Sequence, residues 1–223
     1  MMPSARPILM SAPMVRALLA GTKTQTRRIV KPQPNARCTE AFVGCDGIWR
    51  FSWPTARAPM SSAADDVLCP YGKPGDMLWV RETWAVGTIY DGIAPRNVPE
   101  CGVRYAATNE RIGIKDRQSI HMPRWASRLT LEITEVRVER LQDITEADAK
   151  AEGAEQLSMD DDGNFYRLAG QGTYRTGYAG LWNHINGDKA GMSWDDNPWV
   201  WALTFKVHKA NVDAVLATAK EPV

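Results

Sequence analysis

Residues 128–141, Arg-Leu-Thr-Leu-Glu-Ile-Thr-Glu-Val-Arg-Val-Glu-Arg-Leu, form the longest strand-like stretch of the chain. Its large apolar residues share one parity in the first half and the other parity in the second half: Leu129, Leu131 and Ile133, then Val136 and Val138. Because side chains alternate between the two faces of a strand, this change predicts a bulge or bend near Thr134-Glu135. A small barrel requires strongly bent strands, so the stretch favours a barrel.

Helix signals follow this stretch and precede a final strand. Thr145 begins a short predicted helix in the manner of a capping box, and Gly153 ends it. Apolar residues at helical spacing mark a second helix that ends at Gly187. Large apolar side chains then alternate through a closing strand at residues 199–207. We therefore expect an α+β fold, a small mixed barrel with flanking helices.

The N-terminal third contains the same kinds of element. Ser11 caps a predicted helix that ends at Gly21, and the Thr-rich run 22–30 predicts a turn leading into a strand. A further strand is predicted at residues 77–82, after the turn Pro74-Gly75-Asp76.

Three long irregular stretches interrupt these elements, at about residues 31–73, 85–127 and 153–175. The first contains one short candidate strand at residues 49–53, and the acidic, Gly-rich segment 158–172 predicts a mobile loop. We expect a single domain over residues 1–209 that carries these stretches as insertions, followed by a weakly held tail at residues 210–223.

Charge and composition narrow the possible partners. The 27 Lys+Arg and 26 Asp+Glu residues leave a net charge of +1, so no global field draws the protein to long nucleic acid or to an anionic membrane. No apolar run reaches the roughly 18 residues of a membrane span. The four cysteines lack a Cys-x-x-Cys pair, which argues against zinc. We expect a cytoplasmic protein with reduced cysteines and no metal or cofactor.

The densest polar cluster is Gly21-Thr22-Lys23-Thr24-Gln25-Thr26-Arg27-Arg28, at the predicted junction of helix and strand. Lysine acts as a base only if its pKa falls, and the positive charges of Arg27 and Arg28 would lower it. Thr26 is then the candidate nucleophile. Residues three apart share a face in a turn but not in a strand, so Lys23 must lie in the turn. The alternative is a solvated basic turn.

Two other placements suggest chemistry. Glu152 lies in the last turn of its predicted helix, where the negative end of the helix dipole favours the protonated carboxyl that a general acid needs. The alternative is a frayed surface glutamate. Trp79 and Trp84 flank Arg81 and Glu82 and form a candidate stacking wall for a nucleobase, with ordinary core packing as the alternative.

Several motifs occur in a particular order. The run Gly21-x-Lys23-x-x-x-x-Arg28 precedes Gly75-Asp76-x-Leu78-x-Val80-x-Glu82, and the long strand, the short helix and the aromatic closing strand follow. Together they resemble the ASCH domain of the PUA-like superfamily. The resemblance is closest to phage and prophage members, through Pro7-Ile8-Leu9, Tyr71-Gly72-x-Pro74-Gly75-Asp76, residues 120–128 and Asn197-Pro198-Trp199-Val200-Trp201. It implies a PUA-like β-barrel with long insertions.

The usual ASCH motif has glutamate at the position of Thr26. Small bacterial ASCH proteins that act as N4-acetylcytidine amidohydrolases have threonine there, together with the lysine and a glutamate on the following helix. By position, the resemblance assigns catalysis to Lys23, Thr26 and Glu152. Further substrate contacts are expected from Gly21, Arg27, Arg28, Trp79, Arg81 and Glu82.

The implied reaction is acyl transfer. Lys23 takes the proton of Thr26, whose Oγ attacks the exocyclic amide carbon of an N4-acylated cytosine, and Glu152 protonates N4 or orients water. Backbone N–H groups of the Gly21 turn are the candidate oxyanion donors. The expected partner is a modified nucleoside or a short single-stranded RNA. The alternatives are a non-catalytic module that binds RNA or a modified base, and an ASCH-type ribonuclease.

Overall fold

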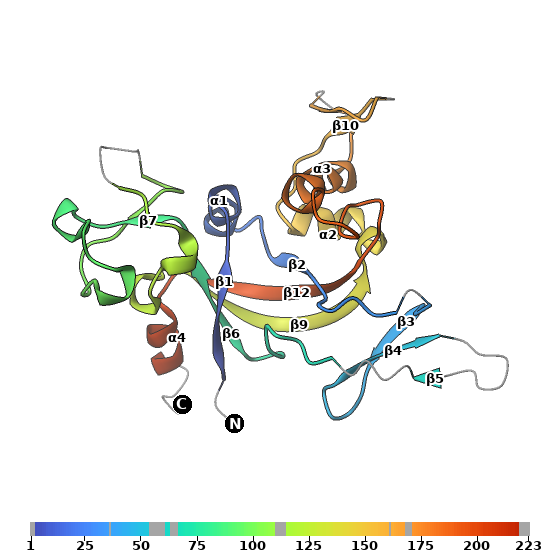
Figure 1. The fold of residues 1–223 in the computed structure, drawn as a ribbon, viewed down its shortest axis with the longest axis horizontal. Coiled ribbons are helices and arrows are strands. Elements are labelled where there is room, and N and C mark those ends of the chain that lie inside the picture. The colour runs from blue at the N-terminus through green and yellow to red at the C-terminus, as the bar shows by residue number, and fades with distance from the viewer. Residues whose placement is uncertain are drawn as a thin grey trace. The chain divides into compact units, whose positions relative to one another are not determined.

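The computed structural model describes residues 3–35, 37–53, 61–62, 67–109, 115–160, 162–167 and 171–218, which form a mixed α+β fold (Figure 1). Five strands share one sheet in the order β1 (Ala5–Leu9), β6 (Met77–Arg81), β9 (Thr130–Arg140), β12 (Trp199–His208) and β2 (Gln25–Ile29). The predicted α+β class is therefore confirmed. Within the described ranges, no pairing joins β1 to β2 and closes this sheet into a barrel.

The chain divides into two compact units. The first comprises Met1–Thr22, Pro74–Thr134 and Phe205–Val223, and the second comprises Lys23–Lys73 and Glu135–Thr204. Strands β9 and β12 contribute residues to both units. The division of β9 falls at Thr134-Glu135, where the sequence pattern changes parity, and both of these residues are exposed.

In the first unit, β1 and β6 are parallel neighbours and β6 pairs antiparallel with β9. Helix α1 (Ala12–Ala20) follows β1, and Gly21 ends it with a φ of 74°, a left-handed conformation that favours glycine. Both helix boundaries agree with those predicted from Ser11 and Gly21. Leu131 and Ile133 alternate as buried residues of β9, as its pattern predicts, whereas β6 is buried on both faces from Met77 to Val80.

The predicted insertion at 85–127 contains short elements around its own apolar cluster. These elements are β7 (Trp84–Ala85), β8 (Arg104–Tyr105) and the 3-10 helices η1 (Thr88–Tyr90), η2 (Pro95–Asn97), η3 (Ser119–His121) and η4 (Arg124–Ala126). Trp84 and Met122 are fully buried in this cluster. The ring of Trp84 meets that of Trp125 edge-on, with centroids 6.3 Å apart.

In the second unit, β12 pairs antiparallel with β2. The predicted insertion at 31–73 forms a three-stranded sheet of β3 (Glu40–Val43), β4 (Trp49–Trp53) and β5 (Ser61–Ser62), so the short strand expected at residues 49–53 is present. Edge-on aromatic contacts link β4 to β12, Trp49 with Trp201 and Phe51 with Trp199. Residues 36, 54–60 and 63–66 of this insertion lie outside the described residues.

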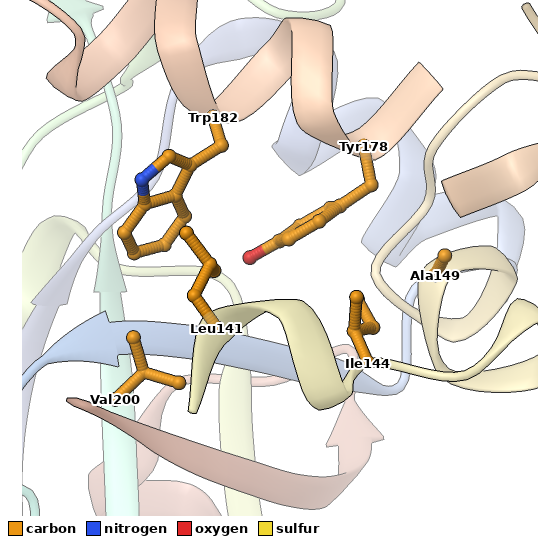
Figure 2. Close-up of a cluster of buried hydrophobic side chains, with 6 residues drawn as sticks. All are labelled: Leu141, Ile144, Ala149, Tyr178, Trp182 and Val200. Carbon is orange, nitrogen blue, oxygen red and sulfur yellow. The ribbon is translucent and has the colours of Figure 1, made fainter. Parts of the chain in front are cut away.

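Two helices of the second unit pack side by side, α2 (Glu146–Ala151) and α3 (Tyr174–Asn186), after the 3-10 helix η5 (Leu141–Asp143) (Figure 1). Thr145 caps α2 by accepting a hydrogen bond from the Asp148 amide, as predicted. Figure 2 shows the buried cluster that these elements share with β12, made of Leu141, Ile144, Ala149, Tyr178, Trp182 and Val200. Tyr178 and Trp182 reach into it from α3.

Two segments are more ordered than the sequence predicts. The segment expected to be a mobile loop contains a two-stranded ribbon, β10 (Ser158–Met159) and β11 (Phe165–Tyr166). The expected weakly held tail contains α4 (Val212–Thr218), whose Val212 is fully buried beside Met77 and Trp79. The residues that bury Val212 lie far from it in the sequence, so local sequence does not reveal this contact. None of the described helices is long and apolar enough to cross a membrane.

Candidate functional site

Among the charged residues that the structure describes in the second unit, Lys23 is the least exposed. It lies in the extended segment before β2, where Thr24 N donates to Ala151 O at 2.8 Å and ties this segment to the end of α2. The side chain of Lys23 is 1% exposed. The expectation that Lys23 lies in the turn is therefore wrong, because Lys23 lies in the extended segment between Gly21 and β2.

The Lys23 ammonium makes two hydrogen bonds to Glu152. Nζ donates to the carboxylate oxygen Oε2 and to the backbone oxygen of Glu152, both at 2.7 Å. Glu152 is the C-terminal cap of α2, and Gly153 follows with a φ of 80°. A cation at this position satisfies an end carbonyl and offsets the helix dipole. The sequence indicated only the helix end as an influence on the Glu152 carboxyl. In the structure the Lys23 ammonium also contacts this carboxyl.

The Lys23 amine is electrostatically unusual. Burial lowers its pKa below the usual value of 10.5, and the positive charges of Arg28 and Arg27 act in the same direction. The Glu152 carboxylate opposes this shift but does not cancel it. The neutral amine is therefore more accessible than in a solvated lysine, as a general base requires.

Arg27 joins Glu152 to a wider network of carboxylates. Its Nε donates to Glu139 Oε1 at 2.8 Å, and Nη1 lies 3.3 Å from both Glu152 Oε1 and Gln25 Oε1. Nη2 approaches Glu139 Oε1 and Asp148 Oδ2, at 2.6 and 3.3 Å, without an aligned hydrogen bond to either. Arg27 is 4% exposed, so its guanidinium contacts these acidic partners and not the solvent.

Thr26 points away from this network. Strand β2 pairs with β12 so that Thr26 is opposite Leu203 and Arg27 is opposite Ala202. Since side chains alternate along a strand, Thr26 faces the side opposite to Arg27. It is 4% exposed, and no hydrogen bond among the described residues joins its hydroxyl to Lys23 or Glu152. The structure brings Lys23 and Glu152 together directly, but not Thr26.

The two faces of β2 have different surroundings. Ile29, which shares the parity of Arg27, packs against the cluster drawn in Figure 2. Arg28 shares the parity of Thr26 and pairs with Trp201, the residue whose ring contacts Trp49. The Lys23–Glu152–Arg27 network therefore lies on the α2 and α3 side of β2, and Thr26 lies on the aromatic side.

The turn at Gly21, in the first unit, has already used the backbone donors expected to bind an oxyanion. Gly21 N donates to Leu18 O at 3.1 Å, and Thr22 N donates to Ala17 O at 3.0 Å. Both bonds satisfy carbonyls at the end of α1, as a left-handed helix cap does. These two amides are therefore not available as oxyanion donors in this conformation.

Three other expected substrate contacts, Trp79, Arg81 and Glu82, also belong to the first unit and are engaged there. Trp79 is 6% exposed, and the Arg81 guanidinium stacks 4.7 Å from the centre of its ring. Glu82 is 1% exposed and accepts from Arg128 Nε and Nη2, each at 2.9 Å. Trp79 therefore packs as an ordinary buried residue, which was the alternative given for the tryptophans.

Sequence reasoning missed several members of the network. Glu139 and Arg137 come from β9, and Asp148 was noted only as part of a helix cap. The alternation Glu135-Val136-Arg137-Val138-Glu139 was the available signal, since it places three charges on one face. Tyr178 of α3 is also close, because the charges of Glu152 and Arg27 affect its pKa. Burial is the main cause that raises this pKa well above its usual value.

The described side chains form no group of three or more His, Cys, Asp or Glu residues that could hold a metal ion. Cys38 is fully buried, as expected for a small apolar group, whereas Cys45 is exposed. Comparisons of the chain with protein-family models, curated proteins and solved structures found no match. The functional argument therefore rests on the site itself and on the sequence resemblance.

Proposed function

We propose that this protein is an amidohydrolase that removes the acyl group from N4-acylated cytidine or a related modified nucleoside. The observation that carries the proposal is the buried Lys23–Glu152 pair, in which a lysine of lowered pKa contacts a carboxylate at 2.7 Å. Amide hydrolysis needs a group that accepts a proton and then returns it to the departing nitrogen. The ASCH resemblance supplies the substrate class.

The proposed reaction proceeds through an ester of Thr26, and each proton that leaves one group passes to another. The neutral Lys23 amine takes the Thr26 hydroxyl proton while Thr26 Oγ bonds to the acyl carbon. The carbon–N4 bond then breaks, and N4 takes a proton from the Lys23–Glu152 pair. Water hydrolyses the resulting Thr26 ester and releases the carboxylic acid. Because Thr26 faces the side of β2 opposite to Arg27, the first step requires the segment around Thr26 to reorient when substrate binds.

Direct assay with N4-acetylcytidine tests this function, with cytidine formation followed by ultraviolet absorbance. Lys23→Arg is the sharpest variant, because it keeps the positive charge beside Glu152 but a guanidinium does not act as a base. We expect turnover by the wild-type protein and its loss in Lys23→Arg and Glu152→Gln. Lys150→Met, on the exposed face of α2, is the matched control and should keep full activity.

The Thr26 step is tested separately by Thr26→Val, which removes the hydroxyl and keeps the shape of the side chain. Loss of turnover in this variant supports Thr26 as the nucleophile, whereas full turnover transfers the attack to water. Turnover that survives both Lys23→Arg and Glu152→Gln would refute the mechanism. If the wild-type protein shows no turnover but binds a short RNA in a salt-sensitive manner, the non-catalytic RNA-binding module is favoured.

The structure gives one reason to rank the non-catalytic module that binds RNA second. Arg27 was expected to contact the substrate, but its guanidinium is buried among Glu139, Asp148 and Glu152. A phosphate would have to displace these carboxylates and would lose their charge-assisted hydrogen bonds.

A further inference from the structure

Two buried N–H donors of the first unit have no hydrogen-bond partner within the described residues, Nε1 of Trp84 and Nε of Arg117. Trp84 is fully buried, and Arg117 is 8% exposed. A donor that is buried without an acceptor costs free energy, and this cost disappears when an acceptor binds. The two donors therefore point to a ligand that accepts hydrogen bonds.

The two donors lie on the same side of a short backbone pairing. Arg117 N donates to Trp84 O at 2.7 Å, and Trp84 N donates to Arg117 O at 3.2 Å. Residues directly opposite each other in an antiparallel pair project their side chains to one face. The Arg117 guanidinium carbon accordingly lies 5.5 Å from the centre of the Trp84 ring. One ligand can thus reach both side chains.

The charge of Arg117 is not balanced by any carboxylate in the described part of the chain. Its Nη1 donates to Ile93 O at 3.0 Å and its Nη2 donates to Tyr90 O, so both terminal nitrogens contact neutral backbone oxygens. Arg128 of the same unit differs, because it forms an ion pair with Glu82. Arginine does not lose its proton in proteins, and a buried charge is costly unless it is paired.

The surroundings of the pair strengthen its attraction for an anion. Trp84 belongs to an apolar cluster, in which Met122 is also fully buried, and a low-dielectric environment increases the interaction between opposite charges. Asp91 follows Tyr90 and is the nearest carboxylate in the sequence to these contacts. Its Oδ1 is itself buried without a partner, so it accepts from neither donor in this structure.

We propose that Trp84 and Arg117 bind a small monovalent anion of the halide type, accepted between the two N–H groups. A hydrogen bond spans about 3 Å, so a single atom can bridge two donors that are up to about 6 Å apart. A sulfate or phosphate ion would bring more charge and more oxygens than two donors and one guanidinium satisfy. A halide needs only these groups.

Chloride is the probe, and the indole N–H signals of the ¹⁵N-labelled full chain report its binding by NMR. Potassium chloride replaces potassium gluconate at constant ionic strength, and the Trp84 signal is assigned by its absence in Trp84→Phe. We expect a saturable shift of this signal and none for Trp182, whose Nε1 already donates to Met192 O at 2.8 Å.

Charge removal tests the part played by the guanidinium. Arg117→Gln should abolish the saturable shift of the Trp84 signal. The matched control is Arg16→Gln, which changes an exposed arginine of the same unit that also donates to a backbone oxygen. This variant should leave the chloride affinity unchanged.

A second measurement does not depend on the folding of Arg117→Gln. A ligand that binds the native chain stabilises it as the ligand concentration rises, so chloride should raise the urea midpoint of the wild type. Trp84→Phe keeps an aromatic ring and removes the indole N–H. It should weaken chloride at least about tenfold, as loss of a hydrogen bond to a charged group does, and should shift the rise to higher chloride.

Three outcomes would overturn the proposal. The first is no saturable shift of the Trp84 signal up to about 0.3 M chloride, twice the physiological ionic strength of about 0.15 M, which would leave water as the acceptor. The second is an equal shift at Trp84 and Trp182, which would report a general salt effect. The third is saturation only in Asp91→Asn, which would make Asp91 the counter-ion of Arg117. None of these results depends on amidohydrolase activity.

Discussion

Replacing Lys23 with methionine removes the ammonium and keeps a side chain of similar length. Among the described residues, the Glu152 carboxylate then keeps Arg27 Nη1, at 3.3 Å, as its remaining hydrogen-bond donor, and its backbone oxygen loses the donor at 2.7 Å. Removing one partner of a buried ion pair costs roughly 3–5 kcal/mol. Because Arg27 remains, we expect the lower end, so the free energy of unfolding should fall by about 3 kcal/mol.

Urea unfolding followed by tryptophan fluorescence measures this change, since the chain has 9 tryptophans. Lys150→Met is the control, because Lys150 is exposed on α2 and its ammonium lies 5.6 Å from the Tyr174 ring. We expect a loss of less than about 0.5 kcal/mol for this variant.

The double variant Lys23→Met/Glu152→Met isolates the cause. Replacing both members of a buried pair with apolar groups is often close to neutral, so it should recover most of the stability that Lys23→Met loses. A loss below about 1 kcal/mol in Lys23→Met, or a double variant less stable than that single variant, would show that the pair is not the source of the effect.

Two further outcomes follow from charges that the structure buries. Burial lowers the pKa of Lys23 below 10.5, so the unfolded chain binds the extra proton, and the free energy of unfolding rises with pH up to about that value. As the pH approaches 10.5 it should therefore rise more steeply in the wild type than in Lys23→Met, by at most about 1.4 kcal/mol per pH unit, and parallel urea-derived profiles would contradict this. Arg128→Leu removes both donors that face the Glu82 carboxylate and should cost about 3 kcal/mol in the same assay. Arg124→Leu, which breaks an exposed pair with Asp213, should cost less than about 1 kcal/mol, and equal losses would argue against burial as the cause.

Local signals were sufficient for the main helices and strands. The cap at Thr145, the left-handed Gly21 and the alternation in β9 and β12 each depend on residues close in sequence, and all lie where expected. The ribbon β10–β11 and helix α4 were missed. Helix α4 is held by partners elsewhere in the chain, such as Met77 and Trp79, whereas β10 and β11 pair with each other.

The candidate site was only partly predictable for the same reason. Lys23 was assigned from its place before a strand, and Glu152 from its place at a helix end, which are both local properties. Their contact at 2.7 Å joins residues 129 positions apart. The Arg27 network with Glu139 and Asp148 likewise requires β2, β9 and α2 to meet, so no short stretch of sequence contains it.

By itself, the sequence determined the α+β class, the positions of the principal elements and the residue types available for acid–base chemistry, because hydrogen bonding and side-chain alternation act over a few residues. Only the tertiary structure decided which of those residues are buried together. It placed Lys23 against Glu152 and turned Thr26 to the other face of β2, because strand pairing with β12 fixes the direction of every side chain along the strand.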